Sequence, residues 1–221
     1  MNACYLTGTD TGIGKTVASV ALLNTLRGHG HRAVGMKPVA SGCDRTAAGL
    51  RNADAEALLA ASRPQPAYAD VNPYAFEAPI APHLAALDAG TPIVLAPIDA
   101  AFRRLAGQAD RVVVEGVGGW MAPLSETLMQ ADLARALALP VVLVVGMRLG
   151  CINHALLTAR AITADGCRLA GWIANRIDPA MERADDNIAS LTGRLPAPLL
   201  GVLDRLDAPG PPAMLDPGFL R

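Results

Sequence analysis

The sequence predicts an α/β fold: a single doubly wound, mostly parallel sheet with helices on both faces. Short apolar runs alternate with helical stretches along the chain. The runs are apolar throughout rather than at every second residue, which is typical of parallel strands covered on both faces. A strand, a glycine-bearing loop and a helix open the chain, and no segment resembles a linker. We therefore expect one domain over residues 1–221.

The N-terminal elements alternate between strand and helix. Residues 3–7 (ACYLT) form an apolar run that predicts a buried strand, and the glycine loop after it leads into a helix over roughly 15–27. Residues 31–39 predict a second strand, broken by its proline, and the alanine- and leucine-rich stretch 53–61 predicts a helix. The proline-studded segment 64–82 lacks a hydrophobic period and is expected to be irregular.

The central part of the chain continues this alternation. Helical spacing of apolar residues returns over 83–89 and 97–107. Residues 111–117 (RVVVEGV) predict a strand that ends in glycines, and 140–146 (PVVLVVG) predict another. The stretch between them, 127–139, has helical spacing.

The C-terminal third is expected to contribute two more strands. A helix is predicted over 151–166, a strand over 168–176 and a long helix over 179–193. The apolar run 198–203 predicts the last strand, and the proline-rich tail from Ala208 is expected to be irregular.

Charge and hydropathy argue against several classes of partner. Acidic and basic residues are spread along the chain and balance to a net charge of −1, so we expect no nucleic-acid and no membrane partner. The longest apolar stretch, 136–147, is interrupted by Pro140 and is too short to span a bilayer. No secretion signal is visible, and the four cysteines lack CxxC spacing. These features predict a cytoplasmic protein with reduced cysteines.

The segment TGTDTGIGKT, residues 7–16, comes close to a phosphate-binding loop. The consensus places four residues between its first glycine and the Gly-Lys-Ser/Thr end, whereas five residues separate Gly8 from Gly14. Backbone N–H groups of such a loop and of the following helix bind phosphate oxygens. Lys15 would reach the terminal phosphates, and the Thr16 hydroxyl would bind Mg²⁺. The competing interpretation is a strand-to-helix turn that needs only the flexibility of glycine.

Lysine is rare in this chain. The sequence has 17 arginines but only two lysines, Lys15 and Lys37. A lysine ammonium is a compact point charge on a flexible stem, unlike the planar guanidinium of arginine. Lys37 ends the predicted second strand, so its side chain is a candidate for the crevice that holds Lys15. The competing interpretation is chance placement of a rare residue.

Two acidic residues are candidates for a metal site. Glu115 ends the apolar run VVVE and precedes Gly116, Val117 and Gly118. A carboxylate at the tip of a buried strand, beside a phosphate loop, is well placed to bind Mg²⁺. Asp54 begins a predicted helix, where an acid also caps the end and opposes the helix dipole. Sequence alone favours this capping role for Asp54.

Three further positions have two interpretations each. Ser41, in PVASG, could contact an anionic ligand or belong to an ordinary turn. The segment GCINH, 150–154, could bind a carboxylate at a helix start, or the helix could be capped by Asn153 or its neighbours. Asn175 could read a purine edge, but its spacing to Asp178 imitates the NKxD element with which GTPases select guanine. The choice of base stays open on these residues alone.

Taken together, these motifs resemble those of the dethiobiotin synthetases, the ATP-dependent P-loop NTPase-like enzymes that close the ureido ring in biotin biosynthesis. The combination of KPVASG, VEGVGGW and LGCINHALLT is specific, and the likeness fades only after about Leu206. The segments that carry it are 7–16, 35–42, 50–55, 71–76, 114–120, 139–159, 171–176 and 196–201.

The resemblance implies a ligase that converts 7,8-diaminopelargonic acid, CO₂ or bicarbonate and MgATP into dethiobiotin, ADP and phosphate. One substrate amine would become a carbamate, and the carbamate oxygen would attack the terminal phosphate of ATP. The second amine would then close the ring on the resulting carbamic-phosphoric anhydride. An anionic carbamate beside polyanionic ATP is opposed by repulsion, which two ammonium groups and the cofactor Mg²⁺ would relieve. The resemblance also implies a homodimer.

The resemblance gives roles to individual residues. Lys15 and Lys37 would be catalytic, and Thr16, Asp54 and Glu115 would bind the metal, which reverses the capping interpretation of Asp54. ATP would contact the loop, the strand ends and an adenine pocket, at Gly12, Ile13, Gly14, Lys15, Thr16, Val17, Asp54, Glu115, Gly116, Val117, Gly118, Asn175, Arg176, Asp204, Arg205 and Leu206. The substrate would contact Thr11, Lys37, Ser41, Gly150, Cys151, Ile152 and Asn153, the last four across the subunit interface.

The chain departs from the family pattern at two positions. Some members carry an acid where this chain has Gly12, so only backbone contact can remain there. An acidic nucleotide contact near the C-terminus falls on Pro211.

The alternative function is that of a switch ATPase of the partitioning or site-selection class, built on the same fold. Those proteins carry a second lysine early in the phosphate loop, where this chain has Thr9, Asp10 and Thr11. Membrane-directed members also end in a basic amphipathic helix, whereas this chain ends PGPPAMLDPGFLR.

Overall fold

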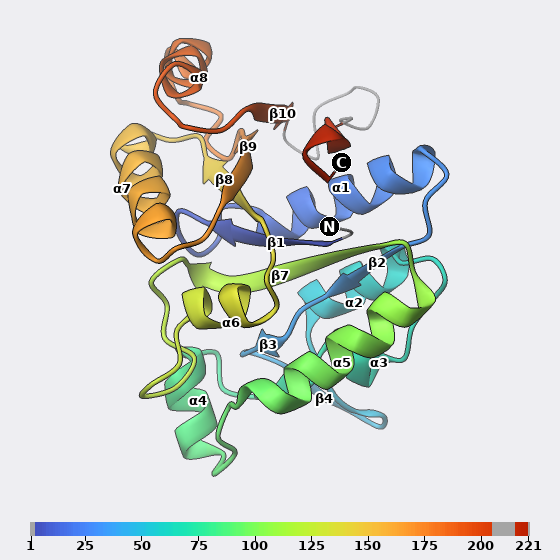
Figure 1. The fold of residues 1–221 in the computed structure, drawn as a ribbon. Helices are drawn as coiled ribbons and strands as arrows, with labels where there is room; N and C mark the ends of the chain where they lie inside the picture. The colour runs from blue at the N-terminus through green and yellow to red at the C-terminus, as the bar shows by residue number, and fades with distance from the viewer. Residues whose placement is uncertain (1–2, 205–214, 221) are drawn as a thin grey trace.

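A parallel sheet forms the centre of the protein. The structure is a computed structural model and describes residues 3–204 and 215–220. The strands of this sheet are β1 Ala3–Gly8, β2 Ala33–Met36, β7 Arg111–Gly119, β8 Val141–Gly146, β9 Leu169–Asn175 and β10 Leu199–Leu203. They lie in the order β10-β9-β8-β1-β7-β2, and all neighbours are parallel (Figure 1). The predicted fold class is confirmed.

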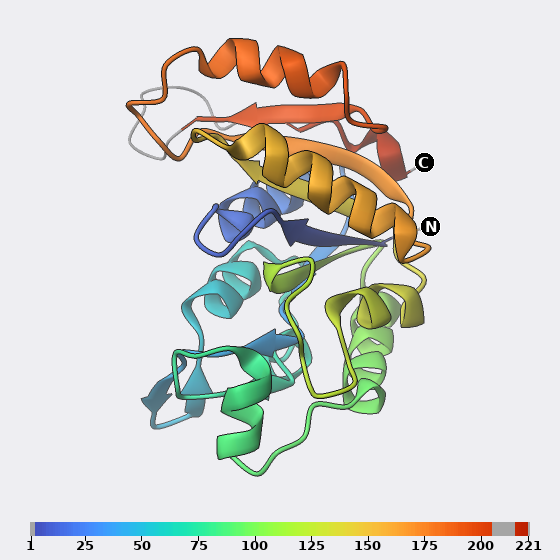
Figure 2. The same ribbon diagram turned by 90° about the vertical axis from the view of Figure 1, so that its left-hand side faces the viewer.

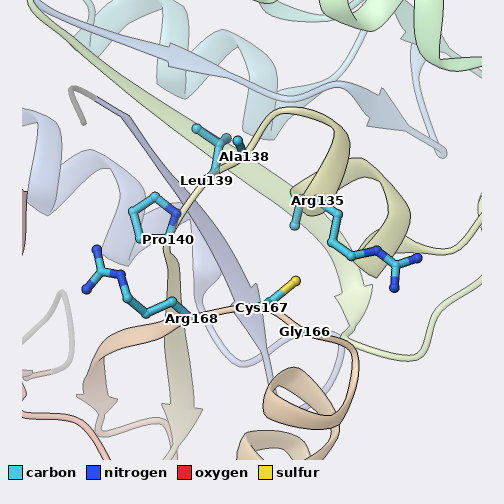
Figure 3. Close-up of a pocket in the computed structure, with 8 residues that line it drawn as sticks. Arg135, Ala138, Leu139, Pro140, Gly166, Cys167 and Arg168 are labelled. Atoms are coloured by element: carbon cyan, nitrogen blue, oxygen red, sulfur yellow. The ribbon is translucent and has the colours of Figure 1, made fainter.

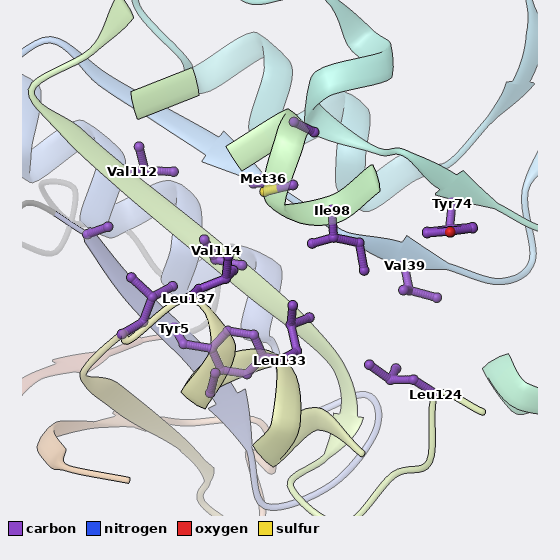
Figure 4. Packing of buried hydrophobic residues seen from close by; sticks show 14 of the residues in the cluster. Tyr5, Met36, Val39, Tyr74, Ile98, Val112, Val114, Leu124, Leu133 and Leu137 are labelled. Atoms are coloured by element: carbon purple, nitrogen blue, oxygen red, sulfur yellow. The ribbon is translucent and has the colours of Figure 1, made fainter. Parts of the chain in front are cut away.

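Helices cover both faces of this sheet. On one face lie α1 Lys15–Gly28 and α2 Ala53–Ala61; on the other lie α5 Leu95–Gln108, α6 Gln130–Ala136, α7 Cys151–Ala164 and α8 Ala184–Thr192 (Figures 1 and 2). Apolar side chains of α1 and α2 pack on Leu6 and Val113 of the sheet. Ile98 of α5 and Leu133 of α6 pack on the opposite face, around Tyr5 (Figure 4). Because both faces are buried, the strands need no polar side, which explains their unbroken apolar runs.

The chain changes direction in the sheet around β1. It passes from β1 to β2 at the edge, returns to β7, and then crosses to β8 on the other side of β1. Loops that follow such strands separate and leave a crevice at their carboxyl ends, which is where ligands bind in open α/β sheets. The loops after β1, β2, β7, β8 and β9 therefore form the expected site.

The predicted strand 31–39 is divided in the structure. β2 ends at Met36, and β3 Val39–Ala40 pairs instead with β6 Tyr74–Ala75 in a separate two-stranded parallel sheet. Pro38 explains the break, since it has no N–H with which to continue the ladder. The segment 64–82, expected to be irregular, contains β6 and the short helix α3 Tyr68–Val71, so that expectation was wrong in part.

The remaining elements are short or lie near the C-terminus. A hairpin that the sequence did not predict joins β4 Asp44–Thr46 to β5 Gly49–Arg51, and α4 is Pro82–Asp88. The described part of the tail contains a 3₁₀ turn, η1 Pro217–Leu220. It is tied down because Thr25 Oγ1 accepts a hydrogen bond from the backbone N–H of Leu215 at 3.2 Å. Among the described residues, no helix has the length and apolar character needed to cross a membrane.

Candidate active site

The loop between β1 and α1 has the geometry of an anion-binding loop. Gly14 is the N-cap of α1, with φ 83°, and no side chain caps this end. The first N–H groups of a helix have no partner within the helix, so they are available to phosphate oxygens. Asn175 Nδ2 donates to the carbonyl of Ile13 at 2.8 Å. A Cβ on residue 14 would lie 2.0 Å from that nitrogen and would displace the Asn175 amide, and the positive φ also favours glycine.

The two lysines meet in one buried cluster. The Lys15 ammonium donates to the carbonyl of Asp10 at 2.9 Å. The Lys37 ammonium donates to Glu115 Oε1 at 2.7 Å and to Asp54 Oδ2 at 3.0 Å. The side chain of Lys37 is 4% exposed and that of Glu115 is 0% exposed. The residue after β2, the middle of β7, the start of α1 and the first turn of α2 thus bring two ammonium groups and two carboxylates together. Glu115 was expected at the tip of its strand, but β7 continues past it to Gly119.

The charges of this cluster depend on one another. Burial, with the nearby Lys37 charge, lowers the pKa of Lys15 to about 8. Burial also acts to lower the pKa of Lys37, but Glu115 and Asp54 outweigh it and raise this pKa above its usual value. Burial acts to raise the pKa of Asp54, but the charge and hydrogen bond of Lys37 hold it below its usual range. Lys37 and Asp54 are therefore ionised at neutral pH.

The oxygen atoms around Lys37 fit a magnesium ion. Thr16 Oγ1 donates to Glu115 Oε1 at 3.0 Å, and the Asp54 side chain is 45% exposed. Glu115 Oε2 is buried without a hydrogen-bond partner in the described part of the chain, so this oxygen is free to bind a cation. Residues 3–204 and 215–220 contain no group of three or more His, Cys, Asp and Glu that could hold a metal. Two carboxylates and one hydroxyl would suit Mg²⁺, which prefers oxygen and keeps several non-protein ligands.

Asp54 does not cap α2. The cap is Asn52, whose Oδ1 accepts from the N–H groups of Asp54 at 3.1 Å and Ala55 at 3.3 Å. The capping interpretation of Asp54 is therefore wrong, and its carboxylate points to Lys37 instead. Asparagine is among the strongest N-cap residues, so the sequence NADA held a signal for this assignment.

A buried glutamine that sequence reasoning missed supports the glycines after Glu115. Gln130, at the start of α6, accepts from the Val117 N–H at 2.9 Å and from the Tyr5 hydroxyl at 2.6 Å, and its amide nitrogen donates back to the Val117 carbonyl. The only sequence signal was an amide at the start of a predicted helix. A Cβ on Gly118 would lie 3.5 Å from Thr11 Oγ1, so this glycine segment and the phosphate loop are neighbours.

Two predicted substrate-contact segments can be located by their hydrogen bonds. The Ser41 carbonyl accepts from Asn52 Nδ2 at 3.4 Å, so Ser41 lies beside the start of α2. The N-cap of α7 is Gly150, with φ 94° and no side-chain cap, so Asn153 does not cap this helix. Arg148, just before it, pairs with Asp10 of the phosphate loop at 2.6 Å. This ion pair connects the start of α7 to the loop between β1 and α1.

A pocket of about 210 Å³ lies at the carboxyl ends of β9 and β10. Arg176 there pairs with Asp185 and, at 3.1 Å, with Asp204. Asp178 Oδ1 accepts from the Ala180 N–H at 2.9 Å, so this carboxylate stabilises a turn. The lining residues are Met147, Arg176, Asp178, Pro179, Met181, Ala184 and Asp204. The predicted contacts Arg205 and Leu206, and Pro211, lie outside the described residues.

A second pocket, of about 330 Å³, lies at the opposite edge of the sheet, where β8 and β9 begin. Figure 3 shows that the guanidinium groups of Arg135 and Arg168 lie on opposite sides of it. Arg135 pairs with Asp132 rather than pointing into the pocket. None of the predicted site residues lines it.

Comparison with known proteins points to one family. A family model described as an AAA domain matches residues 2–213. The ATP-dependent dethiobiotin synthetase BioD of Xanthomonas oryzae pv. oryzae is 67% identical over 199 residues, which are 90% of this chain and 89% of that protein. The protein of the same name from Xylella fastidiosa is 59% identical over 215 residues, 97% of this chain and 95% of its own length.

Solved structures share the fold at low sequence identity. The MinC:MinD cell division protein complex of Aquifex aeolicus gives a TM-score of 0.57 at 16% identity, covering 94% of this chain and 83% of that one. The signal recognition particle receptor FtsY of Elizabethkingia anophelis, in complex with GDP, gives 0.53 at 15% identity, covering 99% and 61%. At these identities the likeness is one of fold alone and does not favour the switch-ATPase alternative. With its P-loop fold and its identity to the curated relatives over most of its length, this chain belongs to the family of ATP-dependent dethiobiotin synthetases.

Proposed function

We propose that this protein catalyses the MgATP-dependent carboxylation and ring closure of 7,8-diaminopelargonic acid to dethiobiotin, with release of ADP and phosphate. The observation that carries the proposal is the cluster of Lys15 and Lys37 with Asp54 and Glu115 beside a phosphate loop. The main obstacle to this reaction is the electrostatic repulsion between a carbamate and the triphosphate that it attacks. A buried ammonium between the nucleotide site and the substrate site reduces this repulsion.

The phosphate loop and Lys15 bind the triphosphate. The free N–H groups at the start of α1 hold the phosphate oxygens, and the Lys15 ammonium lies beside the terminal phosphates. Mg²⁺, held by Thr16, Asp54 and Glu115, supplies Lewis-acid polarisation of the phosphates when it is bound. The base lies in the pocket of about 210 Å³ next to Arg176.

Lys37 holds the reacting carbamate. Its ammonium donates hydrogen bonds to the carbamate oxygens and compensates their charge while one of them attacks the terminal phosphate. Thr11 and Ser41 orient the rest of the substrate chain. The attack of the carbamate oxygen breaks the bond between the terminal phosphate and ADP, so ADP leaves and a carbamic-phosphoric anhydride forms. The second amine then attacks the anhydride carbon and loses a proton as the ring closes and phosphate leaves.

The substrate carboxylate binds at the start of α7, and two copies of the chain complete the site. Gly150, Cys151, Ile152 and Asn153 form this helix start, whose N–H groups suit a carboxylate. The homodimer is what the resemblance to the dethiobiotin synthetases implies. We expect a cytoplasmic homodimer, and light scattering of the purified protein at micromolar concentration tests the oligomeric state.

Phosphate release from MgATP and bicarbonate, with and without diaminopelargonic acid, tests the function. We expect release only with the diamine, and one dethiobiotin per phosphate by mass spectrometry. Phosphate release that does not respond to the diamine would contradict the proposal and return the switch ATPase as the better interpretation.

A further inference from the structure

A hydrogen-bonded amide fixes the backbone of Lys37. Asn72, on the loop between α3 and β6, is 4% exposed. Its Nδ2 donates to the carbonyl of Lys37 at 2.7 Å and to that of Tyr74 at 3.0 Å. The Lys37 N–H donates to the carbonyl of Val71 at 2.7 Å. Both backbone groups of Lys37 are therefore satisfied by one segment, residues 71–72.

The break in the sheet makes these contacts necessary. The ladder between β2 and β7 ends at Met36, because Pro38 prevents its continuation. Buried backbone groups need partners, and Lys37 is the residue at which the sheet stops supplying them. Without residues 71–72, nothing in the ladder would fix the direction in which the Lys37 side chain leaves the backbone.

The same amide is linked to the helix that carries Asp54. The Tyr68 hydroxyl donates to Asn72 Oδ1 at 3.2 Å and accepts from the Asn52 N–H at 2.8 Å. Asn52 caps the start of α2, where Asp54 lies. The guanidinium of Arg51 lies 4.0 Å from the centre of the Tyr68 ring and holds it in place. The Tyr68 hydroxyl thus connects Asn72, which binds the Lys37 backbone, to Asn52, which caps the helix that carries Asp54.

Every polar atom of this linkage has a partner of the right kind. Asn72 donates through Nδ2 and accepts through Oδ1, the Tyr68 hydroxyl donates once and accepts once, and Asn52 Oδ1 accepts at the helix cap. Asn72 and Asn52 are buried, and Tyr68 is partly buried. The orientation of the Asn72 amide is fixed, because a flipped amide would set its oxygen against the carbonyl oxygens of Lys37 and Tyr74.

We propose that Asn72 and Tyr68 are positioning residues for the reaction. Asn72 sets the Lys37 backbone so that the ammonium falls between Asp54 and Glu115. Tyr68 links Asn72 to the N-cap of α2, so that the positions of Lys37 and Asp54 relative to each other stay fixed during turnover. The inference rests on the proposed function. It concerns residues that touch neither the phosphate loop nor the start of α7.

Removal of one hydroxyl tests this coupling with little risk to folding. Tyr68→Phe deletes the atom that joins Asn72 to Asn52 and keeps the ring under Arg51. Tyr74→Phe is the matched control, because it removes the same group from the same segment, but that hydroxyl contacts the backbone of Val94. We expect Tyr68→Phe to lower kcat about tenfold with the KM for ATP within about twofold, since the misplaced group acts on chemistry rather than on nucleotide binding. Tyr74→Phe is expected to keep kcat within about twofold of the parent protein.

A double variant separates positioning from simple loss of stability. Asn72→Ala is expected to lower kcat about 100-fold. Adding Tyr68→Phe to it should lower kcat no further, because the hydroxyl then has no amide to hold. Urea unfolding of all variants gives their stabilities. Equal kcat values for Tyr68→Phe and Tyr74→Phe, effects on kcat that multiply in the double variant, or a kcat loss that follows stability alone would overturn the inference. A parent protein that forms no dethiobiotin would instead contradict the proposed function.

Discussion

Replacement of Lys37 by methionine should strongly destabilise the protein before any substrate is added. The Lys37 ammonium is 2.7 Å from Glu115 Oε1, and the two side chains are 4% and 0% exposed. Methionine fills similar space but leaves the Glu115 carboxylate buried without its counter-charge. Breaking a buried ion pair by removing one partner costs about 3–5 kcal/mol. Asp54, which is 45% exposed, adds little, since exposed pairs contribute about 1 kcal/mol or less.

The expected loss can be measured as a shift in thermal and urea unfolding. For a chain of this size, 1 kcal/mol corresponds to roughly 2–4 °C, so Lys37→Met should lower the Tm by about 6–20 °C. The double variant Lys37→Met/Glu115→Gln removes both charges and should recover to within about 2 kcal/mol of the parent. Glu115→Gln alone leaves Lys37 next to Asp54 only and should lie between the two.

Two outcomes would refute this reasoning. A Lys37→Met protein that loses less than about 1 kcal/mol would mean that the pair is solvated, as surface pairs are. A double variant no more stable than Lys37→Met would mean that lost packing, rather than the uncompensated Glu115 charge, causes the effect. The free energies are comparable if all variants show the same slope of unfolding free energy against urea concentration, measured by circular dichroism.

Three other outcomes follow from the phosphate loop and the strand before it. ATP affinity, measured by calorimetry, should weaken as the pH rises above about 8. The reason is that burial lowers the pKa of Lys15 to about 8, and only the ammonium form of Lys15 attracts phosphate. Lys15→Arg should remove this pH dependence, because arginine stays charged. Gly14→Ala should abolish ATP binding, because its methyl group would lie 2.0 Å from Asn175 Nδ2. Gly30→Ala is the control: this glycine also has φ +83°, but a methyl group there would have nothing within 4 Å. We expect it only to lower the free energy of unfolding, by about 1–2 kcal/mol. Thr7→Val should keep full activity and leave the free energy of unfolding equal or higher, because the Thr7 hydroxyl is buried without a partner among the described residues.

Local signals in the sequence were sufficient to predict the central sheet and to predict that Lys15 and Lys37 lie close together. The runs that became β1, β7 and β8 are buried on both faces, so their apolar character alone marks them as central strands. Lys15 and Lys37 could be expected in one crevice because parallel strands place their carboxyl ends at one edge. That expectation needed no knowledge of the intervening residues.

The parts that were missed depend on partners far apart in the sequence. Gln130 and Tyr5 are 125 positions apart, and Asn72 lies 35 positions from Lys37. A buried amide looks like any surface amide until the fold supplies its carbonyl partners. The separate β3–β6 sheet also depends on such a contact, since its strands of two residues each have no hydrophobic period of their own. Asn52 was different, because its capping role is local and could have been recognised.

The proposed reaction requires that the Lys37 ammonium act on the carbamate rather than on the binding of ATP. Measurement of the ATP dissociation constant and of kcat for dethiobiotin formation in Lys37→Arg tests it most directly. We expect an ATP affinity within about threefold of the parent and a kcat lowered about 100-fold, because the planar guanidinium keeps the charge but misplaces it. Near-normal dethiobiotin formation by Lys37→Arg, or a loss confined to ATP affinity, would show that Lys37 does not have this role.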